Sequence, residues 1–222
     1  MSLIGKEIDL LINYPKPKRN LEQRKNEKTE EDRKIARKFD KEFFDGDRKH
    51  GYGGFNYNPK FWTNVIPTFC NYYKLKDGAK ILDVGCAKGF MIYDFLKFNH
   101  TFQMRGIDIS TYAIEHAKEE VKDYLDIGCA SNLPYEDNFF DLVISINTVH
   151  NLEEKNCAIS LKEIQRVTKK NSFITVDAYN NEEEKERMFN WNLTGKTIFS
   201  TDDWKKFFEK NQFYGDYYWF IP

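Results

Sequence analysis

Two glycines and one aspartate have the residue types and spacing of a turn that binds a ribose-containing cofactor. Residues 81–84 form a short, mostly apolar run that predicts a buried parallel strand, and Gly85 and Gly89 follow it. Glycine lacks a Cβ atom, so the backbone can turn sharply there and lie against a ligand. Asp108 ends the next predicted strand, where a carboxylate can accept hydrogen bonds from two ribose hydroxyls.

The spacing within this turn distinguishes between two cofactors. A nicotinamide-binding turn needs glycine at its first, third and sixth positions, which here hold Gly85, Ala87 and Phe90. Phe90 is a poor fit at a position where the helix must pack closely on the strand. The pattern Asp-x-Gly-x-x-x-Gly, which begins at Asp83, fits S-adenosylmethionine (SAM) better.

With these features the chain resembles the class I SAM-dependent methyltransferases, specifically the small single-domain type. The resemblance covers roughly residues 75–177 and includes the segment 132–145, Asn-Leu-Pro-Tyr-Glu-Asp-Asn-Phe-Phe-Asp-Leu-Val-Ile-Ser. It implies that SAM is held by the turn, by the ends of the following strands and by a loop before the first strand. The implied cofactor-binding residues are Asp83, Gly85, Cys86, Ala87, Gly89, Asp108, Ile109, Ala130, Ser131, Asn132, Asn147, Tyr52 and Gly53.

The adenine end of this site departs from the resembled family. Family members often carry an aspartate at the position of Cys129, where it bonds the adenine amino group. Without it, the backbone of Ala130 or the side chains of Ser131 and Asn132 contact the adenine edge, or the contact is absent. Apolar neighbours such as Ile109 could sandwich the ring.

Three residues at the ends of later strands are the candidate catalytic groups. His150 has an unperturbed pKa near 6.5, which suits removal of a proton from a hydroxyl or ammonium. It could equally cap or orient the next helix. Asp177 could orient His150 or bind a substrate amine, and Tyr179 could hydrogen-bond the acceptor, although both could also be strand-end caps.

Alternating patterns predict the elements that must position these residues. Apolar runs at 79–84, 103–109, 124–128, 140–146 and 172–178 predict strands, and helical patterns separate them. The predicted fold is therefore α/β, a Rossmann-like, doubly wound and mostly parallel sheet with helices on both faces and an N-terminal helical extension. The resembled fold usually ends with two strands, one of them antiparallel, but only 214–221 gives a clear strand signal.

The chain divides by pattern into an N-terminal arm (1–28), a helical extension with a cofactor-covering loop (29–74) and a SAM-binding domain (75–222). An amphipathic helix is expected from Thr29 to Asp45. The loop around Tyr52 either covers the cofactor or is an aromatic packing loop. With His150 and the loop 191–197, it is expected to shape the acceptor pocket.

Composition limits the class of partner. The formal net charge is −1, so bulk charge gives no argument for nucleic acid or membrane, and the four cysteines form no metal-binding pattern. We expect a cytoplasmic enzyme that needs no metal and methylates an O or N atom of a small polar molecule, with no membrane partner; a homodimer stays open. Two alternatives remain: an RNA or protein methyltransferase guided by the basic arm at 16–25, and a non-catalytic SAM-binding subunit.

Overall fold

The computed structural model describes residues 5–16, 29–52 and 55–222. Gly53 and nearly all of the basic arm at 16–25 lie outside the described residues. In the part of the chain that is described, no helix is both long enough and apolar enough to cross a membrane.

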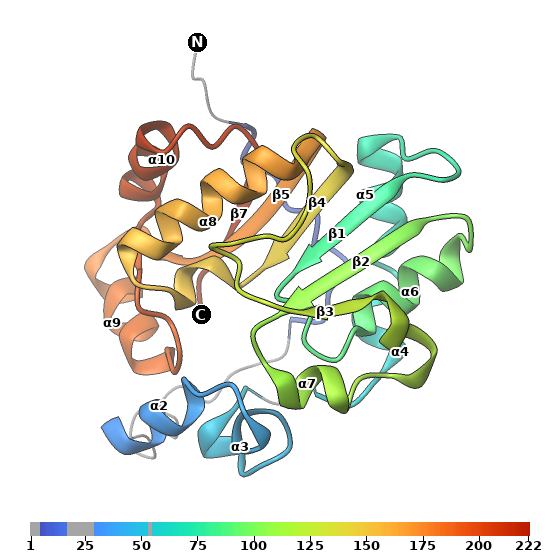
Figure 1. Ribbon diagram of the computed structural model, residues 1–222. Coiled ribbons are helices and arrows are strands. Elements are labelled where there is room, and N and C mark those ends of the chain that lie inside the picture. Colours follow the sequence, from blue (N-terminus) through green and yellow to red (C-terminus); the bar gives the residue numbers. More distant parts are fainter. Residues whose placement is uncertain (1–4, 17–28, 53–54) are drawn as a thin grey trace.

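A parallel sheet forms the centre of the molecule, as predicted (Figure 1). Its first five strands lie in the order β3-β2-β1-β4-β5. This order places the first βα turn at the switch point of the sheet, where ligands bind in folds of this type. The strand bounds are β1 (Lys80–Val84), β2 (Gln103–Asp108), β3 (Leu125–Ile127), β4 (Phe140–Ile146) and β5 (Thr168–Tyr179).

Helices cover both faces of the sheet. One core cluster packs α8 and α10 against one face, and a second packs α5 and α6 against the other. The helices are α2 (Glu30–Ala36), α3 (Lys41–Phe44), α4 (Pro59–Trp62), α5 (Ile66–Tyr73), α6 (Phe90–Phe98), α7 (Thr111–Glu115), α8 (Glu154–Val167), α9 (Glu182–Trp191) and α10 (Thr201–Lys210), with 3-10 turns η1 (Arg48–His50), η2 (Glu119–Tyr124) and η3 (Val149–Asn151).

The outer edge of β5 differs from what the family resemblance implies. The short strand β6 (Phe199–Ser200) and the last strand β7 (Asp216–Phe220) both pair with β5, and both run parallel to it. No antiparallel strand occurs in the described residues. The N-terminal segment lies along the free edge of β7, where the amide of Ile8 donates to the carbonyl of Tyr217 at 2.9 Å.

The prediction of one helix from Thr29 to Asp45 is wrong. Thr29 does cap a helix, but α2 ends at Ala36 and a second helix, α3, begins at Lys41. Phe39 between them has a φ of 50°, and the Asp40 side chain caps α3. The capping preference of Asp40 and the left-handed Phe39 therefore override the helical spacing of the apolar residues.

We predict that Phe69→Ala lowers the free energy of unfolding by about 3–5 kcal/mol, because truncation leaves a cavity between α5 and the sheet. Phe69 is fully buried, and its ring centroid lies 5.3 Å from that of Phe173 in β5. Urea unfolding measures the effect. Phe98→Ala is the control, since Phe98 is 52% exposed and its loss should change stability by no more than about 0.5 kcal/mol. Equal effects of the two substitutions would contradict this packing.

Candidate active site

A cavity of about 1700 Å³ lies beyond the carboxyl ends of the central strands. The ends of β1, β2, β4 and β5 form its floor, and residues of α3 and of the loop around Tyr52 form its cover. Figure 1 shows α2 and α3 beyond the arrowheads of these strands. A single-ligand pocket usually encloses about 300–1000 Å³, so this cavity has room for a cofactor and an acceptor together.

The turn after β1 alternates between ordinary and left-handed backbone conformations. Gly85, Ala87 and Gly89 have φ values of 85°, 48° and 74°. A Cβ atom on Gly85 would overlap the side chain of Thr148, so the turn can approach the end of β4 only with glycine there. Gly89 serves packing instead, because a Cβ atom there would lie 2.8 Å from Val121.

The carboxylate of Asp108 joins the ends of β1 and β2. Its Oδ2 accepts from the amide of Ala87 at 2.8 Å, and its Oδ1 accepts from the amide of Ser110 at 2.8 Å. Burial raises the pKa of Asp108, and these backbone hydrogen bonds oppose that shift. Each carboxylate oxygen can accept a further hydrogen bond, so the group can also receive a pair of hydroxyls.

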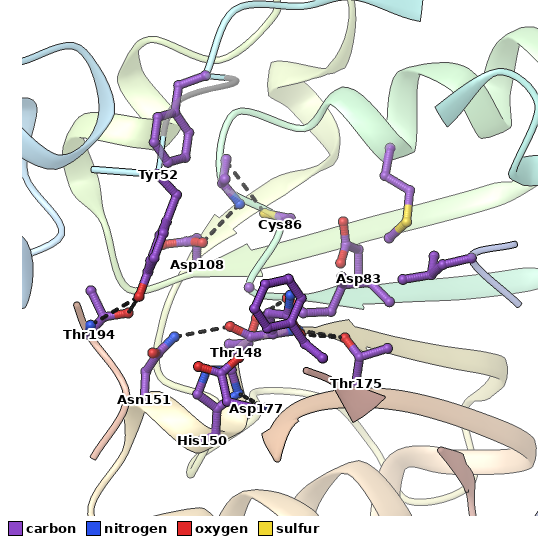
Figure 2. A pocket seen from close by; sticks show the side chains of 18 of the residues that line it. Tyr52, Asp83, Cys86, Asp108, Thr148, His150, Asn151, Thr175, Asp177 and Thr194 are labelled. Carbon is purple, nitrogen blue, oxygen red and sulfur yellow. Dashed lines mark hydrogen bonds and ion pairs between the residues drawn. The ribbon is translucent and has the colours of Figure 1, made fainter. Parts of the chain in front are cut away.

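Asp83, near the end of β1, is a second carboxylate in the cavity wall, and it is buried (Figure 2). It is 3% exposed, and no hydrogen-bond donor among the described residues contacts it. Burial and the nearby charge of Asp108 raise the pKa of Asp83 to about 8. A buried carboxylate without a donor favours a cationic ligand, so this residue fits the ammonium group of an amino-acid-like cofactor.

The cavity wall beyond β2 and β3, where the resemblance predicts adenine, is apolar. Ile109 is 55% exposed at the end of β2, and Gly128, Cys129 and Ala130 line the cavity beside it. The Cys129 Sγ lies 3.1 Å from the Ser131 Oγ. Of the three residues predicted to contact an adenine edge, only Ala130 lines the cavity, and the contact itself stays a prediction.

Asn147 lines the cavity after β4 in a left-handed conformation, with φ at 51°. Its amide donates to the Oγ1 of Thr175 at 2.9 Å, and that hydroxyl donates to the Oδ1 of Asn147 at 2.8 Å. The Nδ2 of Asn151 donates to the carbonyl of Asn147 at 3.1 Å. Three side chains thus hold an uncommon backbone conformation at the end of β4.

His150 and Asp177 form a buried pair (Figure 2). The amide of Asp177 donates to the Nδ1 of His150 at 3.3 Å, and the Nε2 lies 3.4 Å from the Asp177 Oδ2. Burial lowers the pKa of His150, and Asp177 opposes the shift, so the ring is neutral at pH 7. Because both ring nitrogens face Asp177, this geometry favours a positioning role; action as a general base stays a prediction.

Tyr52 connects the cover to the loop after α9. Its hydroxyl accepts from the amides of Leu193 at 2.8 Å and Thr194 at 3.3 Å, and its ring stacks on Trp191 with centroids 5.9 Å apart. Burial, with a smaller effect from Asp177, raises the pKa of Tyr52. The hydroxyl therefore stays protonated and positions the loop.

An ion pair between the buried Lys88 and the partly exposed Asp45 attaches the cover to the turn after β1. The Nζ of Lys88, a residue 6% exposed, donates to the two carboxylate oxygens of Asp45 at 2.6 and 2.8 Å. The hydroxyl of Tyr112 donates to the same carboxylate at 2.7 Å. An apolar cluster that includes Phe43 and Phe44 packs around this contact. The extension is therefore joined to the turn itself.

The cavity wall contains most of the residues predicted from sequence. Those that line it are Tyr52, Asp83, Gly85, Cys86, Ala87, Asp108, Ile109, Ala130, Asn147, His150 and Asp177. Gly89, Ser131, Asn132 and Tyr179 do not line it, and the ring of Tyr179 instead contacts Lys185. A role for these four residues stays a prediction.

Many other residues of the wall were not singled out as site residues from sequence, among them Phe43, Phe44, Lys88, Thr148, Thr175 and Phe220. Thr148 and Thr175 lie near strand ends, a position that indicates ligand contact once the strands are known. Phe43 and Phe44 were part of a predicted helix with no signal that it faces the site. In the described part of the chain, no group of three His, Cys, Asp or Glu residues could hold a metal ion.

Comparisons with known proteins agree with this geometry. A family model described as a methyltransferase domain matches residues 75–212. The chain is 35% identical over 120 residues to a demethylmenaquinone methyltransferase of Staphylococcus saprophyticus, a match that covers 52% of this chain and 49% of the relative. It is 32% identical over 111 residues to a tRNA (carboxymethyluridine(34)-5-O)-methyltransferase of Arabidopsis thaliana, over 50% of this chain and 26% of the relative.

Among solved structures, the YcgJ protein of Bacillus subtilis has a TM-score of 0.54 at 17% identity and covers 66% of this chain and 67% of its own. That likeness shows the fold. The chain spans half or less of the length of the two curated relatives. The family match over residues 75–212 shows that this chain belongs to the class I SAM-dependent methyltransferases.

Proposed function

We propose that this protein transfers a methyl group from SAM to an O or N atom of a small polar metabolite. The observation that carries the proposal is a pair of carboxylates, the buried Asp83 and the half-buried Asp108, which line the cavity at the ends of β1 and β2. One has no donor among the described residues, and the other is held by two backbone amides. This pair suits a ligand that carries an ammonium group at one end and a ribose at the other.

The residues that would hold the cofactor follow from their chemistry. Asp108 would accept hydrogen bonds from the ribose hydroxyls, and Asp83 would pair with the amino group of the methionine part. The exposed side chain of Ile109 would cover the adenine. When bound, SAM supplies an electrophilic methyl group on a sulfonium.

The chain itself contributes alignment and exclusion of water. The cover packs Tyr52 against the loop after α9 and closes the side of the cavity opposite the strand ends. Asn147, fixed by Thr175, would lie beside the methionine end of the cofactor, and His150, fixed by Asp177, would lie on the acceptor side. Positioning of this kind can lower a barrier by roughly 7–11 kcal/mol, so the reaction does not require a dedicated base.

The small-molecule assignment is supported by the cover. The cavity lies between the strand ends and an extension that is attached by Lys88 and Asp45, which suits an acceptor small enough to be enclosed. The relatives include proteins named for small molecules and for tRNA, so they do not choose between these acceptors. The RNA alternative depends on the arm at 16–25, nearly all of which lies outside the described residues.

Asp108→Asn should weaken binding of S-adenosylhomocysteine by roughly 10- to 100-fold, because a charged acceptor of two hydroxyl groups is lost. Isothermal titration calorimetry measures the dissociation constant. Asp123→Asn is the matched control, since Asp123 is exposed on the surface. Unchanged affinity in Asp108→Asn would remove the main support for the cofactor site.

Binding of S-adenosylhomocysteine should depend on pH through Asp83. Its pKa of about 8 leaves it mostly protonated at pH 7, whereas an ammonium ligand favours the ionised carboxylate. Affinity should therefore rise from about pH 6 to pH 8 with release of a proton, and Asp83→Asn should abolish the dependence. Calorimetry in buffers of different ionisation enthalpy counts the proton.

The raised pKa of Asp83 also determines the direction in which the stability of the protein changes with pH. The folded value of Asp83 lies above the unfolded value, so its contribution to the free energy of unfolding is lost as the pH rises between about 4 and 8. His150 titrates at a lower pH than Asp83, because burial lowers the pKa of His150 below 6.5. The assignment of Asp83 would be contradicted if the affinity for S-adenosylhomocysteine did not change between about pH 6 and pH 8. It would also be contradicted if Asp83→Asn left the pH dependence of that affinity unchanged.

Asp45→Asn should loosen the cover, because it leaves the buried Lys88 ammonium without a carboxylate. Hydrogen exchange should accelerate in residues 29–52 by about tenfold or more while β1 and β4 keep their protection. Glu31→Gln is the control, since Glu31 is exposed and pairs with the exposed Lys34. Equal exchange in the two variants would show that the ion pair does not hold the cover.

A further inference from the structure

The cavity continues past Asp83 along one face of the sheet. Asp83 in β1 is the register partner of Ile144 in β4. Two residues farther along β4, Ile146 is the partner of Thr175 in β5, which is the partner of Tyr218 in β7. Register partners share a face of the sheet, and so do residues two positions apart on one strand. Asp83, Ile146 and Tyr218 therefore lie on one face, the face that α5 and α6 cover.

Apolar side chains from five segments line this end of the cavity, which we call the apolar chamber: Leu11, Trp62, Met91, Ile146 and Tyr218. They come from the N-terminal segment, α4, α6, β4 and β7, and all belong to or pack against one core cluster. Met91 is buried, whereas the other four are half-buried and keep accessible surface. Apolar surface that remains accessible in a cavity favours a ligand that covers it.

The N-terminal segment forms one wall of the apolar chamber and is attached to the fold on both sides of Leu11. Before it, the amide of Ile8 donates to the carbonyl of Tyr217 on the edge of β7. After it, the Nδ2 of Asn13 donates to the carbonyl of Asn64 at 3.3 Å. Leu11 is thus held against the strand ends, and the wall is part of the folded structure.

The apolar chamber lies beyond the residues assigned to the cofactor. The sheet order places β2, which ends at Asp108, on one side of β1, and places β4, β5 and β7 on the other side. A cofactor held by Asp108 and Asp83 would therefore lie over β2 and β1. The cavity of about 1700 Å³ exceeds the roughly 300–1000 Å³ of a pocket for one ligand, so the chamber has room for part of a second molecule.

The chemistry of the apolar chamber is uncharged. None of its five side chains carries a charge at pH 7 in its ordinary state. Lys16 and Asp9 line the cavity beside them but form an ion pair, with 3.1 Å between Nζ and Oδ2. Burial, followed by the charge of Asp9, raises the pKa of Tyr218, so its hydroxyl stays protonated. Such a wall favours a ligand that brings apolar surface, since removal of that surface from water stabilises the complex.

We propose that the apolar chamber binds an apolar group of the methyl acceptor. The proposal narrows the proposed function and rests on it, because it names the acceptor as a molecule whose O or N atom is attached to an alkyl or aromatic body. An acceptor without such a body would leave the surface of Leu11 and Trp62 in contact with water. Each methylene group that enters the chamber should tighten binding by roughly fourfold.

The test compares 4-ethylphenol with 4-butylphenol, which differ by two methylene groups and share one hydroxyl. Each is titrated by calorimetry into the full chain loaded with S-adenosylhomocysteine. 4-Butylphenol should bind more tightly than 4-ethylphenol by about tenfold or more. Equal affinities, or no detectable binding of 4-butylphenol, would overturn the proposal.

Two variants of neighbouring residues locate the effect. Leu11→Trp fills part of the apolar chamber, so it should remove most of the preference for 4-butylphenol over 4-ethylphenol. Ile12→Trp is the matched control and should keep the preference, because Ile12 is 64% exposed and does not line the cavity. A preference that survives Leu11→Trp would place the alkyl group elsewhere and contradict the proposal.

A crystal structure of the wild-type chain with S-adenosylhomocysteine and 4-butylphenol provides a second measurement, which decides if Leu11→Trp does not fold. The butyl group should lie against Leu11, Ile146 and Tyr218. Electron density for the butyl group at any other place in the molecule would overturn the proposal.

Binding of S-adenosylhomocysteine is measured in every sample, which separates the failure of this inference from the failure of the proposed function. Normal cofactor binding with equal affinities for the two phenols overturns the inference and leaves the proposed function standing. Absence of cofactor binding in the wild-type chain overturns the proposed function.

Discussion

The site depends on one carboxylate that holds two strand ends together. Asp108 accepts from the amide of Ala87 in the turn after β1 and from the amide of Ser110 at the start of α7. Ala87 is left-handed, so the turn needs such an external partner to keep its conformation. The two hydrogen bonds bring the turn and the second strand into one fixed crevice, and a second acid, Asp83, faces the same crevice from β1.

The rest of the site is assembled around this crevice from segments that are far apart in the chain. The extension reaches the turn through Asp45 and Lys88, and it reaches the loop after α9 through Tyr52. The guanidinium of Arg33 in α2 adds a hydrogen bond to the carbonyl of Asn192. The cover is thus attached both to the turn after β1 and to the loop after α9.

Much of the central fold could be predicted, because each strand of the sheet is a short apolar run and each connecting helix has a clear period. The position of Asp108 followed from the same pattern, since a strand end is a local feature. The break at Phe39 and Asp40 could not be read from the apolar spacing, which continues across it. The parallel direction of β7 also could not be predicted from the sequence of that strand, because the direction is decided by pairing with β5.

Contacts on the predicted acceptor side of the cavity also could not be predicted from local sequence patterns. His150 and Asp177 were visible as strand-end residues, but their mutual contact and their burial depend on the loop that holds Asn192. Phe220 and Trp191 meet only because β7 lies beside β5 and α9 returns toward the cover. Contacts between segments separated by more than a hundred residues, such as Tyr52 with Leu193, leave no periodic signal in either segment.

The most direct test of the central claim is a crystal structure of the full chain with S-adenosylhomocysteine. The account predicts electron density for the ribose against the carboxylate of Asp108 and for the amino group beside Asp83. Density for the ligand at another place in the molecule, or a ribose turned away from Asp108, would contradict it.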